Sequence, residues 1–128
     1  EDQMRIYALD RITSLCLTEE TFEMPADFSA QKYFSEYFGV LINDTPLAHV
    51  VLRAHKWMPD YLRTLPQHHS QRELQSTPDY TDFSYDIRTT SDFLGELMRH
   101  SVGIEVLEPG ELREKMKKML VDTLERYS

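Results

Sequence analysis

The sequence predicts an α+β domain in which a four-stranded antiparallel sheet is backed by helices. Three observations support this fold class. Two segments alternate apolar and polar residues, three segments repeat apolar residues at helical spacing, and one short segment is polar on both faces. From residue 46 onward the expected order is strand, helix, strand, strand, helix, strand and a final helix. This order is that of the ferredoxin-like βαββαβ arrangement with an extra C-terminal helix.

Two segments are expected to be the central strands. Residues 80–88 alternate most clearly, with the two-residue period of a strand that buries one face. The apolar positions of this segment are Phe83, Tyr85 and Ile87. Residues 47–55 show the same pattern, and their apolar positions are Ala48, Val50, Leu52 and Ala54. The ferredoxin-like order places these two strands in the middle of the sheet, so local pattern and topology agree.

A helix is expected after each of these strands. The first has Pro59 in its first turn, where proline is tolerated. Its apolar stripe consists of Trp57, Tyr61, Leu62 and Leu65. The second follows Thr90 or Ser91, whose hydroxyl is suited to capping a helix. Its stripe consists of Phe93, Leu94, Leu97 and Met98.

The remaining elements are two edge strands and a last helix. Residues 67–75 are polar on both faces, which favours an edge strand, and residues 104–108 form a short closing strand. After Pro109 a helix is expected at about 111–127. Its stripe consists of Leu112, Met116, Met119, Leu120, Leu124 and Tyr127. A continuous stripe must cover an apolar surface, and we favour the helix's own sheet over pairing with a second copy.

Residues 1–45 are predicted to form a separate unit. Residues 4–17 alternate imperfectly and indicate one or two strands. A short aromatic helix, capped by Asp27 or Ser29, is then expected to end at Gly39. The turn-forming residues 43–46 mark the domain boundary. Because the chain begins almost at once on strand-like sequence, we expect it to be part of a longer protein.

Composition and charge restrict the function classes. The 128 residues carry a net charge of -8, which argues against wrapping duplex DNA, because phosphate binding requires accumulated lysine and arginine. No segment has the roughly eighteen consecutive apolar residues of a membrane span, so no membrane contact is expected. The single cysteine, Cys16, cannot form an internal disulfide, which favours a cytoplasmic location.

Neither the histidines nor the carboxylates predict catalysis. His68 and His69 are adjacent, and neighbouring residues of a strand point to opposite faces, so they cannot easily share a metal. Asp82 and Asp86 share a strand face, but any outward strand face produces such a pattern. The sequence has no glycine-rich phosphate loop, no paired CxxC and no nucleophile elbow. We expect no enzyme, no cofactor and no metal; an enzyme that uses His68 or His69 is the least favoured hypothesis.

The first strand-like segment contains a candidate anion site. Arg5, Tyr7 and Arg11 share a face if the strand is regular, so they offer two guanidinium groups and a phenol to an anionic partner. Such arginines also pair with carboxylates of their own chain, and Asp10 is adjacent to Arg11. The residues alone leave both interpretations open.

Several segments resemble a known family of bacterial transcription regulators. The segment RIYALDRITSL is similar to the end of the WYL domain of these regulators. The extension that follows this domain, called WCX, resembles the later segments AHVVLRA, YLRTLP with HHSQ, and TTSDFLGELMRHSVGIEVLEPGELREKM. The last of these is the most specific. The Trp-Tyr-Leu run that names the family is not in this sequence, since Trp57 stands between Lys56 and Met58.

This resemblance implies a fold, a function and a set of contact residues. Residues 1–45 would be the terminal strands and helix of a truncated, Sm-like WYL β-barrel, and residues 46–128 a ferredoxin-like WCX extension. The implied function is ligand sensing and oligomerisation in a transcriptional regulator whose helix-turn-helix lies upstream and alone contacts duplex DNA. The implied partners are a second copy in a homodimer and a nucleotide or single-stranded nucleic acid as effector. The implied ligand-binding residues are Arg5, Tyr7, Arg11, Arg53, His68 and Gln71.

The alternative is a stand-alone ferredoxin-like domain that binds a small molecule and has no link to transcription. The coding sequence upstream separates the two hypotheses. A helix-turn-helix and a Trp-Tyr-Leu run are expected there under the first hypothesis and not under the second.

Overall fold

In a computed structural model, which describes residue 5 and residues 7–128, the regular structure lies mostly after residue 46. These elements are β1 (Leu47–His55), α2 (Met58–Thr64), β2 (Arg72–Ser76), β3 (Tyr80–Arg88), α3 (Ser91–Arg99), β4 (Ile104–Glu108) and α4 (Gly110–Glu125). They are preceded by a 3-10 turn, η1 (Leu9–Arg11), and a short helix, α1 (Ala30–Phe34). The order of elements after residue 46 is the one predicted.

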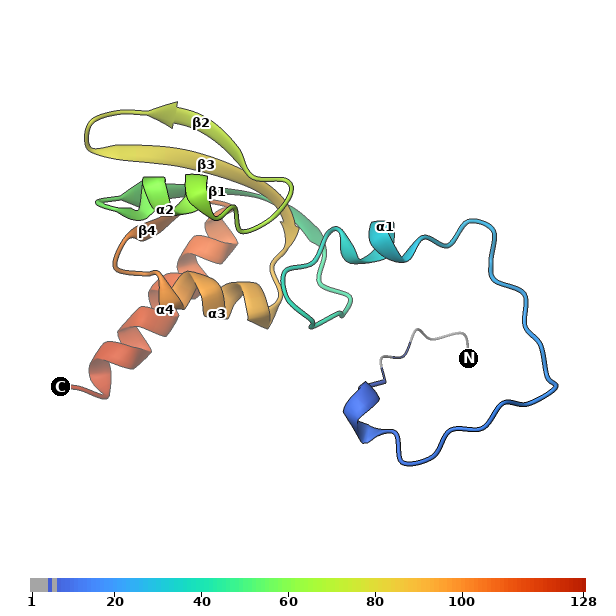
Figure 1. Cartoon of the computed structure of the whole chain (residues 1–128). Helices are drawn as coiled ribbons and strands as arrows, with labels where there is room; N and C mark the ends of the chain where they lie inside the picture. Colours follow the sequence, from blue (N-terminus) through green and yellow to red (C-terminus); the bar gives the residue numbers. More distant parts are fainter. Residues whose placement is uncertain (1–4, 6) are drawn as a thin grey trace.

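The four strands form one antiparallel sheet in the order β2-β3-β1-β4 (Figure 1). The two strands with the clearest alternation, β1 and β3, are central and pair along their whole length, from Leu47 opposite Arg88 to His55 opposite Tyr80. The polar strand β2 lies at one edge and β4 at the other. The structure therefore confirms an α+β fold built on a four-stranded antiparallel sheet with helices.

One face of the sheet carries the hydrophobic core. Its strand residues, each at most 2% exposed, are Val50, Leu52, Ala54, Phe83, Tyr85 and Ile87. Helices α2 and α3 cover this face, and their buried residues are Met58, Leu62, Phe93, Leu94 and Leu97. Because successive strand residues point to opposite faces, the two-residue period in the sequence correctly identified the core side of both central strands.

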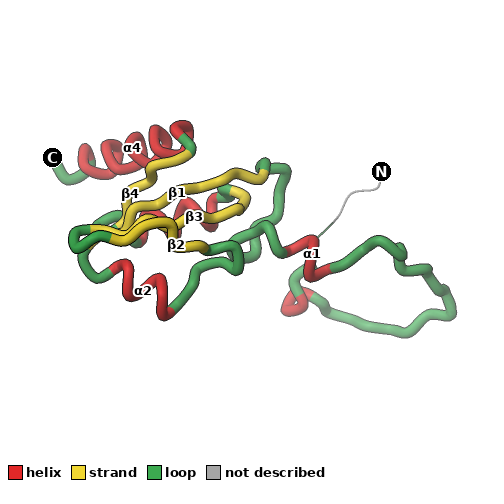
Figure 2. Tube along the Cα trace, turned by 90° about the horizontal axis from the view of Figure 1, so that it is seen from above, coloured by secondary structure: helices red, strands yellow, loops and turns green. Residues whose placement is uncertain are grey.

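Helix α4 lies beside the edge strand β4, as Figure 2 shows from above. Its first half is packed on the domain, with Leu112 and Met116 at most 6% exposed. Its second half leaves much of the predicted stripe in solvent. The exposed fractions are 42% for Leu120 and 67% for Leu124 in this half, and 87% for Tyr127 just beyond the end of the helix. The helix therefore covers its own sheet, as expected, over only half of its length.

The strands expected at residues 4–17 are wrong for the part of that segment that the structure describes. Residue 5 and residues 7–17 are coil except for η1, and Cys16 is exposed. Residues 4 and 6 lie outside the described residues. Alternation by itself cannot make a strand, because the backbone donors and acceptors of a strand need a neighbouring strand. Figure 1 shows the chain before α1 looping away from the sheet.

Helix boundaries also differ in detail from the sequence prediction. Ser29 caps α1, and its hydroxyl accepts a hydrogen bond from the Lys32 N–H at 3.3 Å. The helix ends at Phe34, several residues before Gly39. In α2 the predicted stripe is rotated: Trp57 and Leu65 are each 55% exposed, and Met58 takes the buried position. The core face is therefore reached by Met58 and Leu62.

Thr90 occupies the N-cap position of α3, as predicted. Its hydroxyl, however, makes no cap hydrogen bond and is buried with no partner among the described residues. The position of the cap was therefore correct and its predicted contact was wrong.

Candidate functional site

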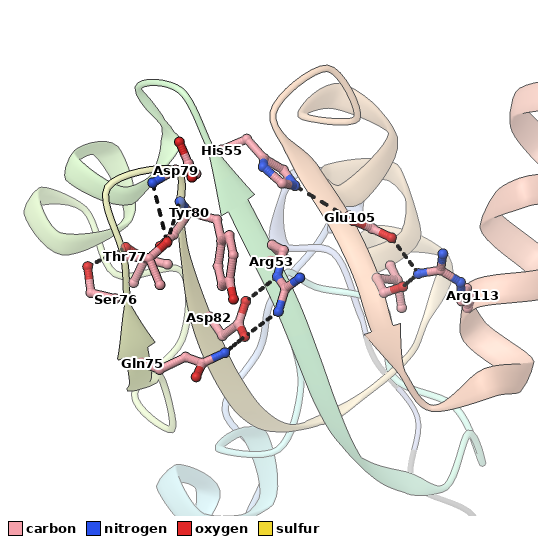
Figure 3. A network of polar contacts seen from close by, with 12 residues as sticks. Arg53, His55, Gln75, Ser76, Thr77, Asp79, Tyr80, Asp82, Glu105 and Arg113 are labelled. Carbon is pink, nitrogen blue, oxygen red and sulfur yellow. Dashed lines mark hydrogen bonds and ion pairs between the residues drawn. The ribbon is translucent and has the colours of Figure 1, made fainter.

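The face of the sheet opposite the core carries a network of polar side chains, shown in Figure 3. Arg53 of β1 lies directly opposite Asp82 of β3. The Arg53 Nε donates to Asp82 Oδ1 at 2.8 Å and Nη2 donates to Oδ2 at 2.9 Å. Gln75 of β2 donates to Asp82 Oδ2 at 2.7 Å. The guanidinium carbon of Arg53 lies 3.7 Å from the centre of the Tyr80 ring, within the range of a cation–π contact.

These contacts explain how a carboxylate is buried on a face that no helix covers. Asp82 is only 4% exposed. The hydrogen bonds from Arg53 hold the pKa of Asp82 below its usual value; burial acts in the opposite direction and Gln75 adds to the lowering. The same bonds raise the pKa of Arg53. The pair occupies Nε and Nη2 of the guanidinium, so Arg53 can bind an external carboxylate or phosphate through this bidentate edge only if Asp82 releases it.

A second ion pair joins α4 to this face. Arg113 Nη1 lies 2.8 Å from Glu105 Oε1, and His55 Nε2 lies 3.7 Å from Glu105 Oε2. The hydrogen bond from Arg113 holds the pKa of Glu105 below its usual value. Arg113 also donates to the backbone oxygen of Val106. The charged side chains on this part of the face are therefore paired with one another.

Gln71 lies in the connection between α2 and β2 and closes the end of the core. Its side-chain amide donates to the Leu62 backbone oxygen at 2.8 Å. Its carbonyl oxygen accepts from the Tyr85 hydroxyl at 2.9 Å and from the Gln67 N–H at 3.1 Å. Burial raises the pKa of Tyr85, which keeps its hydroxyl a donor. These side-chain contacts of Gln71 are thus all internal to the domain.

His68 and His69 stack on each other in the same connection, with ring centres 4.2 Å apart. The expectation that they point to opposite faces is wrong, because they lie in a loop and not in a strand. His68 Nδ1 lies 2.7 Å from the Ser70 hydroxyl, and Nε2 is buried without a hydrogen-bond partner among the described residues. Burial, and next the His69 ring, lower the pKa of His68. His69 Nε2 lies 2.6 Å from the Ser35 backbone oxygen.

The first three predicted ligand residues lie in a different part of the chain. Arg5 and Tyr7 are exposed in coil, and Arg11 is exposed at the end of η1. Among the described residues, no hydrogen bond or ion pair connects them with Arg53, with the His68 loop or with Gln71. The structure does not bring the six residues into one site, and their ligand role stays a prediction.

Sequence reasoning missed a groove of about 450 Å³ between α3, β4 and α4. Its apolar lining includes Leu97, Ile104, Val106, Met116, Leu120, Val121 and Leu124. Polar side chains at the groove include Ser101, Glu105, Arg113 and Lys117. A signal for it was present in the sequence, because the apolar stripe predicted for α4 spans sixteen residues, about 24 Å of helix, whereas the five residues of β4 extend over only about 17 Å.

In the part of the chain that the structure describes, no three His, Cys, Asp or Glu side chains come together as metal ligands. A helix long and apolar enough to cross a membrane is likewise not found in that part.

Comparison with known protein families matches residues 46–124 to the WCX domain. A search of curated proteins returns no match. The matched range begins just before β1, includes the whole sheet and ends near the last residue of α4. It covers more than half of the chain, so the chain belongs to the WCX domain family.

Proposed function

We propose that this chain is the ligand-sensing and oligomerisation part of a cytoplasmic bacterial transcriptional regulator whose helix-turn-helix lies upstream. Its role is binding and not catalysis. Family membership supports the regulator assignment, and the single observation that supports oligomerisation is the uncovered half of α4. Exposed apolar side chains that continue an apolar groove are typical of interaction sites. Here the groove and the exposed residues belong to the same helix.

The finer fold assignments belong to the same proposal. The sheet order β2-β3-β1-β4, with a helix after β1 and another after β3, supports a ferredoxin-like topology. Residues 1–45 are assigned to the end of a WYL domain on the resemblance of their sequence.

We assign a second copy of α4 as the occupant of the groove. The first half of the helix, residues 110–117, carries one more basic than acidic residue, with Arg113, Lys115 and Lys117 against Glu111 and Glu114. The second half, residues 118–125, carries one more acidic than basic residue, with Asp122 and Glu125 against Lys118. Antiparallel packing of two copies places the basic half of one helix beside the acidic half of the other. It also forms the self-complementary interface of a twofold dimer, in which each copy inserts Leu120 and Leu124 into the groove of the other.

Light scattering on the wild-type chain and on Leu124→Glu tests this assignment. The wild type is expected to be a dimer at micromolar concentration, and the variant a monomer, because a buried unpaired carboxylate opposes association. Leu74→Glu is the matched control: Leu74 is 55% exposed on β2, away from the groove, and its variant should remain dimeric. A wild type that is monomeric at all concentrations contradicts the proposal.

The proposed effector is a nucleotide or single-stranded nucleic acid, bound through the exposed residues Arg5, Tyr7 and Arg11. A fluorescent oligothymidylate, titrated into the wild-type chain and into Arg11→Ala, tests this part. Loss of one phosphate contact should weaken binding and reduce its salt dependence. Arg126→Ala, which removes an exposed arginine of the α4 C-cap, is the control. Equal affinities of all three chains contradict the effector site.

The second candidate function is a stand-alone domain that binds a small molecule. It is favoured by the groove, whose volume of about 450 Å³ falls within the usual range of ligand pockets. The upstream coding sequence discriminates between the candidates, since only the regulator requires a helix-turn-helix there.

A further inference from the structure

Residues 35–45, here called the strap, precede the matched family range but are bound to the corner where β3 meets α3. Arg88, the last residue of β3, donates to Glu36 Oε2 from Nη2 at 2.7 Å and from Nε at 3.0 Å. The Arg88 backbone N–H donates to the Glu36 backbone oxygen at 2.8 Å. Its Nη1 donates to the Thr45 backbone oxygen at 2.6 Å. One arginine thus holds both ends of the strap.

Asp92, in the first turn of α3, holds the middle of the strap. Its Oδ2 accepts hydrogen bonds from the Val40 N–H at 3.0 Å and from the Leu41 N–H at 2.8 Å. Gly39 makes this approach possible. Its φ is +73°, and a Cβ added there would lie 2.6 Å from Asp92 Oδ2. Both the backbone conformation and the close contact therefore require glycine.

Further contacts add to the attachment, including that of the Ser35 backbone oxygen with His69 Nε2 at 2.6 Å. The Phe38 ring packs against the core, with its centre 5.9 Å from that of Phe93. The Tyr37 hydroxyl donates to the Asn43 backbone oxygen at 2.9 Å, which closes the strap on itself. The strap therefore has a single aromatic anchor in the core and several polar attachments, whereas the sheet is held by a continuous apolar core.

We propose that the strap is a reversible attachment, here called the clasp, between the WCX domain and the chain that precedes it. All of its contacts open and close together, as one unit. Segments held mainly by polar contacts and little buried apolar surface open at lower free energy than the core. Opening frees Arg88 at the end of β3 and Asp92 at the start of α3. Both elements therefore lose side-chain contacts when the strap opens. In the regulator proposed above, on which this role rests, the clasp couples the upstream segment to the WCX domain.

Amide hydrogen exchange on the full chain, followed by NMR, tests the clasp. The reporters are the Val40, Leu41 and Arg88 amides, which lie at separate attachments. Gly39→Ala removes no hydrogen-bonding atom but prevents the approach to Asp92. It should accelerate exchange at all three reporters by about tenfold or more, the effect of losing a hydrogen bond to a charged group. Gly95→Ala is the matched control, because an added Cβ there meets nothing within 4 Å, and it should leave the reporters unchanged.

A second pair of variants tests the coupling from the other side. Arg88→Lys removes the bidentate pair with Glu36 and should accelerate exchange of the Val40 and Leu41 amides, which Arg88 does not touch. Arg113→Lys alters a similar pair on α4 and should not. If Gly39→Ala accelerates exchange only at Val40 and Leu41, or Arg88→Lys only at Arg88, the strap does not open as one unit. If either variant accelerates exchange of the Val50 and Tyr85 amides as much as that of the strap reporters, the strap unfolds together with the core and is not a clasp. Neither outcome depends on the dimer measured by light scattering.

Discussion

The two faces of the sheet are made by the same central strands but are held together in different ways. On β3, Phe83 and Tyr85 point into the core and are each 1% exposed, whereas Asp82 and Ser84 point the other way and are only 4% and 5% exposed. The core face is buried by helices laid over it. On the open face, the Asp82 carboxylate is covered by the side chains that bind it, Arg53 and Gln75. Low exposure on a strand therefore does not by itself indicate an apolar environment.

This difference has energetic consequences. The core face depends on apolar area removed from water, a term that does not depend on pH or salt to first order. The open face depends on charged hydrogen bonds, which exist only while the carboxylates are ionised. The comparison predicts that substitutions on the two faces differ both in size and in pH dependence.

The largest effect is expected for Phe83→Ala. Removing a fully buried aromatic ring should lower the free energy of unfolding by about 3–5 kcal/mol, measured by urea denaturation at pH 7. The acid dependence of the variant should parallel that of the wild type. Leu74→Ala, at a 55% exposed position, is the control and should change stability by less than about 0.5 kcal/mol. Similar losses for both variants would mean that the core has been placed on the wrong face.

A smaller effect, with a different pH dependence, is expected for Asp82→Asn. The loss of charge-assisted hydrogen bonds should cost about 1–2 kcal/mol at pH 7. Because Arg53 lowers the pKa of Asp82 in the folded state, this contribution is present above the unfolded value of 3.8 and is lost as the pH falls from that value through the lower pKa of the folded state. Denaturation at several pH values from 7 to 3 should show a flatter acid limb for the variant. An unchanged limb contradicts the pairing.

His68→Gln should show a still smaller effect at mildly acidic pH. Burial lowers the pKa of His68 in the folded state, so the neutral form is favoured there. Its contribution to stability is complete above the unfolded value of 6.5 and declines as the pH falls below that value. Melting temperatures measured between pH 7.5 and 5.5 should therefore fall less for the variant than for the wild type. A melting temperature that falls as steeply for the variant as for the wild type over this range contradicts a buried, neutral His68.

The smallest effect is expected for Glu73→Gln. Glu73 is bound by Arg63 at 2.9 Å, but its side chain is 40% exposed. The pair lowers the pKa of Glu73, with Arg63 as the main cause. Exposed pairs contribute little and are screened by salt. The variant should be slightly less stable than the wild type at low ionic strength and indistinguishable from it in 1 M NaCl. A difference that persists in high salt contradicts a purely electrostatic contribution.

The sequence predicted the local elements of this domain well and its contacts less well. Alternation found β1 and β3, and helical spacing found α3 and α4, because these periods are properties of single segments. The pairing of Arg53 with Asp82 was not predicted, since it depends on the register between two strands. The internal role of Gln71 was missed for the same reason, because its partners come from α2 and β3.

Residues before 46 show the limits of pattern reading most clearly. The same alternation that marks β1 also occurs in residues 4–17, but the described part of that segment pairs with no strand. Gly39 was interpreted as a helix end, whereas its positive φ brings the strap to Asp92, more than fifty residues away. Neither outcome can be derived from neighbouring residues.

By itself, the amino-acid sequence determined the order of strands and helices after residue 46 and the apolar side of β1, β3 and α3. It placed the start of β2 too early, at residue 67 instead of Arg72, and rotated the apolar side of α2. Only the tertiary structure decided which polar groups are buried, where α4 stops covering the sheet and how the strap is attached. The physical reason is that periodicity reports the surroundings of one segment, whereas hydrogen bonds, ion pairs and grooves arise between segments that folding brings together.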